Sequence, residues 1–251
     1  MEWVMVVLAG GAAGSHVVWK LKQRADERRD RAAELDLART LAEEDVRAFG
    51  EQLERLGVDV AASDVAHIAK QHHQTAIDIH ADAQSMVAAS ATAGEISDLI
   101  ATLARGHHAA ACVRAHLAGE PVPESTLPCF FNPQHGQSSR KVTWTSPRRG
   151  THRVPACARC ATRVAVREKP DVRTISISGH RAPYWEAGAA LHPYCRGYFP
   201  GTGASSSMAW LYDSRVVGPA AAGGADAPSF GAHGGREYGG FDTGSDSGTR
   251  P

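Results

Sequence analysis

Residues 129–160 read CFFNPQHGQSSRKVTWTSPRRGTHRVPACARC, and this stretch decides the fold that we expect. It contains a C-x5-H pair and a C-x2-C pair that lie about twenty residues apart. The candidate metal ligands are Cys129, His135, Cys157 and Cys160. Structural zinc sites take four thiolate or imidazole ligands, usually as pairs from two turns. The spacing therefore predicts a zinc-ribbon or treble-clef-like site with structural Zn²⁺ as its cofactor.

The same cysteines permit other interpretations. They could be buried thiols beside a loop histidine with no metal, or a redox switch in which oxidation of Cys157 and Cys160 releases zinc. A thioredoxin-type catalyst is not favoured, because no strand–helix unit follows the C-x2-C pair. Cys195, in the segment HPYCRGYF, is either a spare fourth ligand or a small buried side chain. If Cys160 points away, Cys195 or water would complete the site.

Short strands and frequent prolines surround this set and predict a small β-containing module over residues 121–200. Strands are expected at 141–145, 151–154 and 172–177, with a turn at 146–150 and one or two helical turns at 160–167. The aromatic residues of the PYW segment 183–185 and the GYF segment 197–199 are expected mainly in the core, with a partner-binding surface as the alternative. Such a module contains few large aliphatic residues, so a metal would supply part of its folding free energy.

The segment 21–120 has helical periodicity and predicts an antiparallel stalk or bundle with coiled-coil-like packing. A first, highly charged helix is expected to end at Gly57, because glycine favours the position after a helix. A second helix is expected to start at Ser63 as its N-cap. A third opens with the capping box Thr92–Glu95 and ends at Gly119.

Residues 3–19 carry no full charge and predict a single-pass transmembrane anchor within residues 1–20. The alternative is a buried or frayed helix. Basic residues follow the run at Lys20, Lys22, Arg24, Arg28, Arg29 and Arg31. This asymmetry predicts a cell-membrane protein, in contact with lipid through residues 3–19, whose bulk lies in the cytoplasm. The Gly10-x3-Gly14 spacing further suggests a homodimer through the anchor.

Composition limits the remaining classes. The chain has 251 residues with 27 basic and 27 acidic side chains, so no overall positive field points to nucleic acid. Its five cysteines are an odd number, which favours reduced thiols with a metal over a disulfide framework. Residues 201–251 are rich in Gly, Ala, Ser and Asp and predict a disordered tail, except for 208–212, which could dock.

A rival site is suggested by helical histidines. His108, Cys112 and His116 recur every four residues on one helix face. Further candidates on the preceding helix are His72, His73, His80, Asp78 and Asp82. Inside a bundle these groups would make a metalloenzyme centre, whereas on an exposed helix they are ordinary surface residues. The chain has no HExxH, GxSxG or P-loop motif, so the sequence assigns no catalytic residue.

The segments LPCFFNPQHGQSSRKVTWT, RVPACARC, HRAPYWEAG and RGYFPG resemble a group of uncharacterised actinobacterial membrane-anchored proteins with a PCFFxPxHG…VPxC…PYWxxG…GYF module. The resemblance is specific over residues 127–200. The matching residues are Cys129, His135, Gly136, Trp144, Cys157, Tyr184, Trp185 and Tyr198. In that group the position of Cys160 is often acidic, which leaves the fourth ligand open. The resemblance supports the architecture and brings no activity with it.

Taken together, these patterns predict an α+β fold class with a single-pass N-terminal helix, an antiparallel helical stalk or bundle, a small zinc-ribbon-like β module and a disordered C-terminal tail. The expected function is that of a membrane-anchored, non-enzymatic interaction or scaffold protein with an unidentified protein partner. The alternatives are a metal-dependent enzyme built on the helical His/Asp/Cys groups, and a thiol redox switch at Cys157 and Cys160.

Overall fold

The computed structural model describes residues 2–63, 67–146, 150–177, 179–201 and 208–212, with only the backbone for 2–17, 177, 209 and 212. The helices are α1 (Glu2–Ala62), α2 (His67–Ala89), α3 (Ala93–Ala118), α4 (Ala158–Ala165) and α5 (His192–Tyr198). The strands are β1 (Arg140–Ser146), β2 (Gly150–Ala156), β3 (Thr174–Ile177) and β4 (His180–Pro183). Short 3-10 turns are η1 (Pro133–His135), η2 (Tyr184–Glu186), η3 (Gly188–Leu191) and η4 (Ala209–Tyr212).

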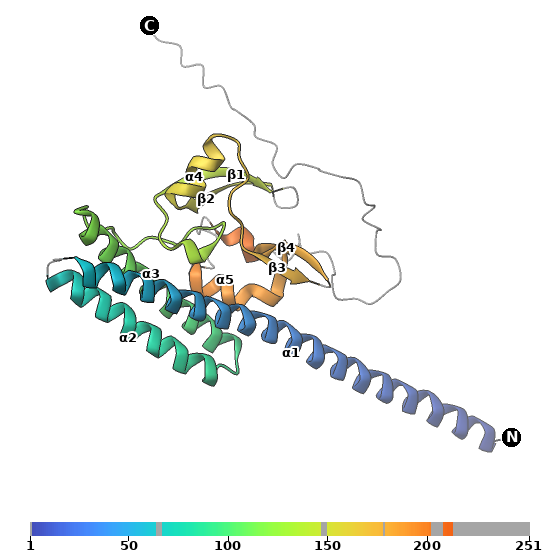
Figure 1. Ribbon diagram of the computed structural model, residues 1–251. Coiled ribbons are helices and arrows are strands. Elements are labelled where there is room, and N and C mark those ends of the chain that lie inside the picture. Colours follow the sequence, from blue (N-terminus) through green and yellow to red (C-terminus); the bar gives the residue numbers. More distant parts are fainter. Residues whose placement is uncertain (1, 64–66, 147–149, 178, 202–207, 213–251) are drawn as a thin grey trace, which may run out of the picture.

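Helices α2 and α3 pack along the second half of α1 (Figure 1). The buried face of α2 consists of Ala69, Ala76 and Ala83, one alanine every seven residues. Alanine has no bulk beyond Cβ, so neighbouring helices can approach α2 closely. On α3, Gly106 serves the same purpose, since a Cβ there would lie 2.7 Å from Cε1 of Phe49 on α1. Small residues therefore set the spacing of this three-helix unit.

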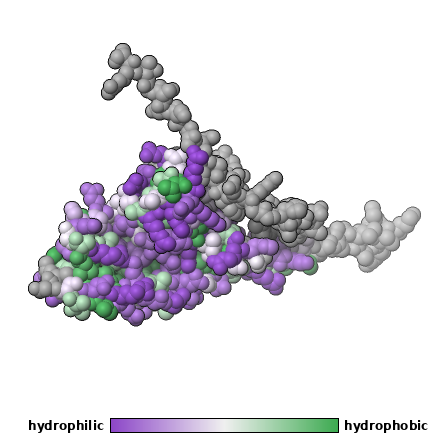
Figure 2. Space-filling model, turned by 45° about the horizontal axis from the view of Figure 1, so that its top comes forward, coloured by the Kyte–Doolittle hydropathy of each residue, from purple (hydrophilic) through white to green (hydrophobic). Residues whose placement is uncertain are grey.

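The first half of α1 extends beyond the rest of the molecule (Figure 1). Its side chains from Val18 to Ala33 are all exposed, and burial begins further along the helix, where Ala38 and Leu41 enter the core. The face of the molecule seen in Figure 2 is mostly hydrophilic, with scattered apolar patches.

The predicted fold class needs correction at its N-terminus. Among the helices that the structure describes, none contains a stretch both long enough and apolar enough to cross a bilayer. The single-pass helix predicted at residues 3–19 is therefore not found. This run instead opens α1, which continues without a break into a highly charged segment. Glycines and polar residues dilute the apolar run at Gly10, Gly11, Gly14, Ser15 and His16. The cell-membrane location, the lipid contact and the anchor-mediated homodimer rested on that helix and stay predictions.

Over the residues that the structure describes, the molecule is helix-rich, and its strands form two separate two-stranded sheets. The expected end of the first helix at Gly57 is wrong, because α1 continues to Ala62. The His73 ring of α2 packs over Gly57, with a distance of 3.3 Å from its Cε1 to the position of a Cβ at that glycine. Packing against α2 thus outweighs the local preference of glycine to end a helix.

The third helix begins and ends as its sequence indicates. The Thr92 hydroxyl accepts from the Glu95 N–H at 3.3 Å, and the Glu95 carboxylate accepts from the Thr92 N–H at 2.8 Å. At the other end Gly119 adopts φ +67°, the left-handed conformation that closes a helix. The predicted N-cap Ser63 is followed by residues 64–66, which lie outside the described part of the chain, and α2 is described from His67.

The β part contains two antiparallel hairpins. Strands β1 and β2 cover the expected strands 141–145 and 151–154, with Trp144 opposite His152. Residues 147–149 of the expected turn lie outside the described residues. Strand β3 lies within the expected 172–177, and its partner β4 was not predicted. The ladder of β1 and β2 is the element that brings the two ligand pairs together.

Aromatic residues join the β part to the helices. Tyr184, Trp185, Tyr198 and Phe199 are all buried, so the PYW and GYF segments form core and not a binding surface. Helix α5 lies against α3 so closely that a Cβ on Gly197 would come within 2.5 Å of the Ser97 carbonyl oxygen. One hydrophobic cluster includes residues of α1, α3, α5 and the β part.

The segment 208–212 docks on this core, as the sequence suggested. Met208 and Leu211 are buried, and Trp210 stacks on His152 with ring centroids 4.2 Å apart. The remainder of the predicted disordered tail, residues 202–207 and 213–251, lies outside the described residues.

Candidate metal centre

The first ligand pair lies on a loop that is closed at its base. Pro128 and Gln137 form an antiparallel bridge, and the Cys129 N–H donates to the Gly136 carbonyl at 2.9 Å. Within the loop, His135 ends the 3-10 turn η1. Gly136 then turns the chain with φ +77°, a conformation that favours glycine. The sequence CFFNPQHG thus folds locally into a knuckle that presents both side chains inward.

The second pair lies where β2 enters α4. Cys157 is the N-cap of α4, and its Sγ accepts from the Cys160 N–H at 3.5 Å. The first loop is held against this turn by main-chain bonds. The Phe130 N–H donates to the Pro155 carbonyl at 2.8 Å, and the Ser139 N–H donates to the Ala156 carbonyl at 2.9 Å. The hairpin therefore fixes the distance between the two pairs.

All four predicted ligands converge. One ligand atom from each of Cys129, His135, Cys157 and Cys160 lies within 4.8 Å of the other three. The Nδ1 of His135 lies 3.6 Å from the Cys157 sulfur and 3.5 Å from the Cys160 sulfur. A tetrahedral zinc site with bonds of about 2.3 Å to sulfur and about 2.0 Å to nitrogen places its ligand atoms about 3.5–3.8 Å apart. This group can hold a metal ion.

Burial divides the group into two kinds of ligand. Cys129 and Cys160 are fully buried, whereas Cys157 and His135 are partly exposed. Cys195, the spare candidate from the sequence, is buried on α5 and is not part of this group. The fourth member of the described cluster is therefore Cys160.

An acidic residue that the sequence analysis missed orients the histidine. The Nε2 of His135 lies 3.2 Å from Oδ2 of Asp171, in the segment before β3. When Nε2–H donates to this carboxylate, Nδ1 is directed toward the three sulfurs. Metal-binding histidines commonly donate their second ring N–H to a carboxylate in this way. Asp171 lies 36 residues after His135, so no local pattern marks it.

Protons are shared across the group. Hydrogen bonding with Cys129 and Cys157 raises the pKa of His135 to about 10. Hydrogen bonds with Cys129 and Cys160 lower the pKa of Cys157, and hydrogen bonds with Cys129 and Cys157 raise that of Cys160. A metal ion must displace these protons to bind.

The rival histidine site does not assemble. Over the described ranges, the Cys129 group is the one place where three or more metal-binding side chains converge. On α3, His108 and Cys112 come within 3.7 Å of each other without a third ligand. His72 and His116 stack ring on ring, with their centroids 5.5 Å apart. Three of the remaining candidates have contacts within the helical unit. His73 and His80 on α2 reach the carbonyls of Leu53 and Val46 on α1, and Asp78 accepts a hydrogen bond from Gln74.

His107 on α3, which the sequence analysis did not single out, is buried, and its ring centroid lies 4.6 Å from that of Phe49 on α1. Burial, with a contribution from the charge of Arg114, lowers the pKa of His107 from 6.5 to about 4. The unfolded chain therefore binds a proton more readily, and stability is lost as the pH falls from about 6.5 to about 4. The pKa difference corresponds to about 3 kcal/mol.

His107→Gln removes this titration and is expected to make unfolding less sensitive to acid. Urea unfolding at neutral and acidic pH should show a smaller loss of stability than in the wild type. His67→Gln, an exposed histidine on α2, serves as the control and should behave like the wild type. Parallel losses in the wild type and His107→Gln would contradict the assignment.

A second polar cluster, the Asp45 network, surrounds the buried carboxylate of Asp45 and consists of Asp45, Gln134, Arg173, Tyr194 and Tyr198. Oδ1 of Asp45 accepts from Gln134 at 2.6 Å and from Arg173 at 3.0 Å. Oδ2 accepts from the hydroxyls of Tyr194 at 2.6 Å and Tyr198 at 2.9 Å. Burial raises the pKa of Asp45, and the charge of Arg173 and the three other hydrogen bonds oppose that effect. Gln134 immediately precedes His135, so this network ties the metal-binding loop to α1.

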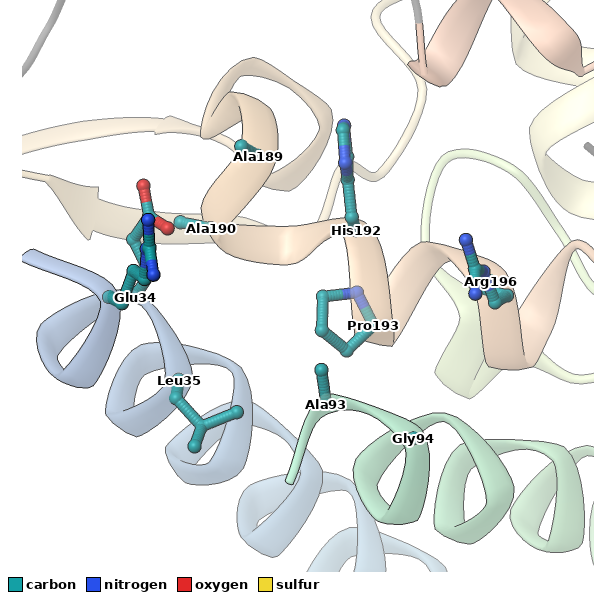
Figure 3. A pocket seen from close by; sticks show the side chains of 10 residues that line it. Glu34, Leu35, Ala93, Gly94, Ala189, Ala190, His192, Pro193 and Arg196 are labelled. Atoms are coloured by element: carbon teal, nitrogen blue, oxygen red, sulfur yellow. The ribbon is translucent and has the colours of Figure 1, made fainter. Parts of the chain in front are cut away.

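A pocket of about 410 Å³ lies between α1, the start of α3 and α5. Pro193 and Ala93 face each other across it, while Glu34 and Arg196 come from opposite sides (Figure 3). Its charges are of both signs and its walls contain several alanines, so the lining does not point to one class of ligand.

Comparison with known proteins does not extend this description. No protein-family model, no curated protein and no solved structure matches the chain.

Proposed function

We propose that Cys129, His135, Cys157 and Cys160 bind a structural zinc ion, and that the protein is a non-enzymatic interaction or scaffold protein. The observation that supports this proposal most directly is the convergence of three thiols and an imidazole within 4.8 Å. Thiolate and imidazole ligands favour zinc over magnesium or calcium, which prefer oxygen. The carboxylate of Asp171 supplies the outer contact that such a histidine usually has.

A structural role fits this set better than a catalytic one. Catalytic zinc sites use three protein ligands and keep a fourth position for water or substrate. Here four protein side chains are available, and two of them are fully buried. The metalloenzyme alternative also loses its ligand set, since the helical histidines contact one another or α1.

The proposed metal would fix the surface by which a partner is bound. The site joins the loop 128–137 to the β2–α4 turn, and the loop in turn contacts α1 through Gln134. We therefore expect binding of a protein partner to depend on the metal. A partner captured by the wild type and by Cys112→Ala should be lost from Cys129→Ser.

Metal binding is tested on the full chain. We expect about one equivalent of zinc after purification, as measured by elemental analysis. With Co²⁺ in its place, visible absorption bands of tetrahedral thiolate coordination should appear. Cys112→Ala, which removes a buried cysteine outside the group, is the matched control and should keep both signals. A folded wild-type protein with less than about a tenth of an equivalent of zinc would rule the proposal out.

A further inference from the structure

We propose that Cys157 is a site of oxidation by peroxides and that Cys160 resolves the oxidised sulfur into a disulfide, which opens the metal centre. Release of metal rests on the proposed function. Formation of the disulfide rests only on the positions of the two cysteines.

The first observation is accessibility. Of the five cysteines, Cys157 alone is partly exposed, and Cys112, Cys129, Cys160 and Cys195 are buried. A small oxidant in solution therefore reaches Cys157 more readily than the four buried cysteines. The order of reaction follows from this difference in exposure.

The second observation is the place of Cys157 in the fold. It caps the N-terminus of α4, a helix of 8 residues, and its Sγ accepts the Cys160 N–H at 3.5 Å. This hydrogen bond holds the sulfur of Cys157 against the main chain of Cys160, the residue that would resolve it.

The third observation is the position of the second sulfur. Cys160 lies three residues on, in the first turn of α4, and its ligand atom is within 4.8 Å of that of Cys157. Helix geometry places Cα atoms three residues apart at about 5 Å. This distance falls inside the range of roughly 4.4–6.8 Å that disulfides require. The pair thus consists of a partly exposed attacking cysteine at a helix N-terminus, followed by a buried resolving cysteine.

The chemistry balances with one peroxide. The Cys157 thiolate attacks one oxygen of hydrogen peroxide, the O–O bond breaks, and with one proton the products are a sulfenic acid and water. The Cys160 thiol then attacks the Cys157 sulfur, the S–O bond breaks, and hydroxide leaves as a second water with the proton from Cys160. In total two thiols and one peroxide give one disulfide and two waters, with two electrons passing from sulfur to oxygen.

The consequence is loss of two of the four metal ligands in one step. Cys129 and His135 would remain, and two ligands do not hold a structural zinc ion. A dithiol reductant restores both thiols, and the site can bind metal again. Oxidation at Cys157 would therefore be converted into a reversible loosening of the loop 128–137.

The sequence makes the test direct, because the five cysteines fall in five different tryptic peptides. Arg159 separates Cys157, in 154–159, from Cys160, in 160–163, and Cys129 lies in 115–140. The reduced full chain is first analysed for zinc and then treated with near-equimolar hydrogen peroxide. Remaining thiols are alkylated, and the digest is examined by mass spectrometry without reduction. Released zinc is followed in parallel with a chromogenic chelator.

We expect peptides 154–159 and 160–163 to be recovered joined, Cys129 to be alkylated, and zinc to appear in step with the disulfide. In Cys160→Ser, a dimedone-type reagent should label Cys157. A disulfide that includes Cys129, or oxidation that leaves Cys157 alkylated, overturns the proposal. So does the absence of any oxidised cysteine at about a tenfold excess of peroxide.

The two proposals fail in different measurements. Absence of zinc before treatment removes the proposed metal centre, and the same joined peptides would then still establish Cys157 and Cys160 as an oxidisable pair. Zinc that is present and stays bound while the disulfide forms removes the link between oxidation and the metal.

Discussion

Replacing Cys129 by serine is expected to unfold the β part of the molecule while most of the helical signal persists. Cys129 is followed directly by Phe130, which is fully buried and lies 4.5 Å from Trp185 and 5.6 Å from Trp144 between ring centroids. Losing the metal therefore releases the loop that carries the centre of the aromatic cluster. Structural zinc binding in small domains carries about 10–16 kcal/mol of apparent free energy, which is comparable with the whole stability of a domain.

Near-ultraviolet circular dichroism of the full chain measures this effect, because it reports on the packing of the aromatic cluster. The signal should collapse in Cys129→Ser, with a far-ultraviolet spectrum that stays mostly helical. A strong chelator added to the wild type should produce the same change, and zinc should reverse it. Cys112→Ala should resemble the wild type. An unchanged near-ultraviolet signal in Cys129→Ser would show that the loop does not depend on a metal.

Asp45→Ala is expected to cost about 3–5 kcal/mol of stability, because it leaves the donors of Gln134, Tyr194 and Tyr198 without their acceptor and removes the buried carboxylate that faces Arg173. The Asp45 carboxylate is fully buried and accepts four hydrogen bonds. Its partners come from η1, the segment before β3, and α5, so the loss should weaken docking of the whole β part on α1. Urea unfolding of the full chain measures the free energy.

The neighbouring Glu44 provides a matched control for this substitution. Glu44 also contacts Arg173, at 2.7 Å, but its side chain is about half exposed. Exposed ion pairs contribute about 0–1 kcal/mol, so Glu44→Ala should have a small effect. A double-mutant cycle of Asp45→Ala with Tyr198→Phe should show coupling, since the Tyr198 hydroxyl donates to Asp45. A loss below about 1 kcal/mol in Asp45→Ala would mean that the network adds little to stability.

The parts of the site that the sequence predicted are those encoded locally. Cys157 and Cys160 are adjacent on one turn, and Cys129 and His135 lie on one loop, so spacing alone identifies them. The capping box at Thr92–Glu95 is likewise a contact between residues three positions apart. Such patterns are visible because the geometry that they require is contained in a few consecutive residues.

The parts that were missed depend on contacts between distant segments. Asp45 lies in the run LAEEDVR and resembles a surface acid, yet its partners are 89 to 153 residues away. The contact of Asp171 with His135 also joins distant parts of the sequence. The continuation of α1 past Gly57 likewise depends on packing by His73 from α2. The anchor prediction failed for a different reason. Its run of about 17 residues was at the lower limit for a bilayer span and contained several glycines.

Helix α1 gives the molecule an unusual hydrodynamic shape. Its 61 residues make a rod about 90 Å long. A compact protein of 251 residues has a radius of gyration of only about 18 Å, so the rod is several times longer than that radius. Because the first half of this rod projects alone, frictional drag is set by the long axis more than by the mass. A single chain will elute from a gel-filtration column ahead of compact proteins of equal mass. Light scattering, which measures mass independently of shape, is the proper measure of association for this protein.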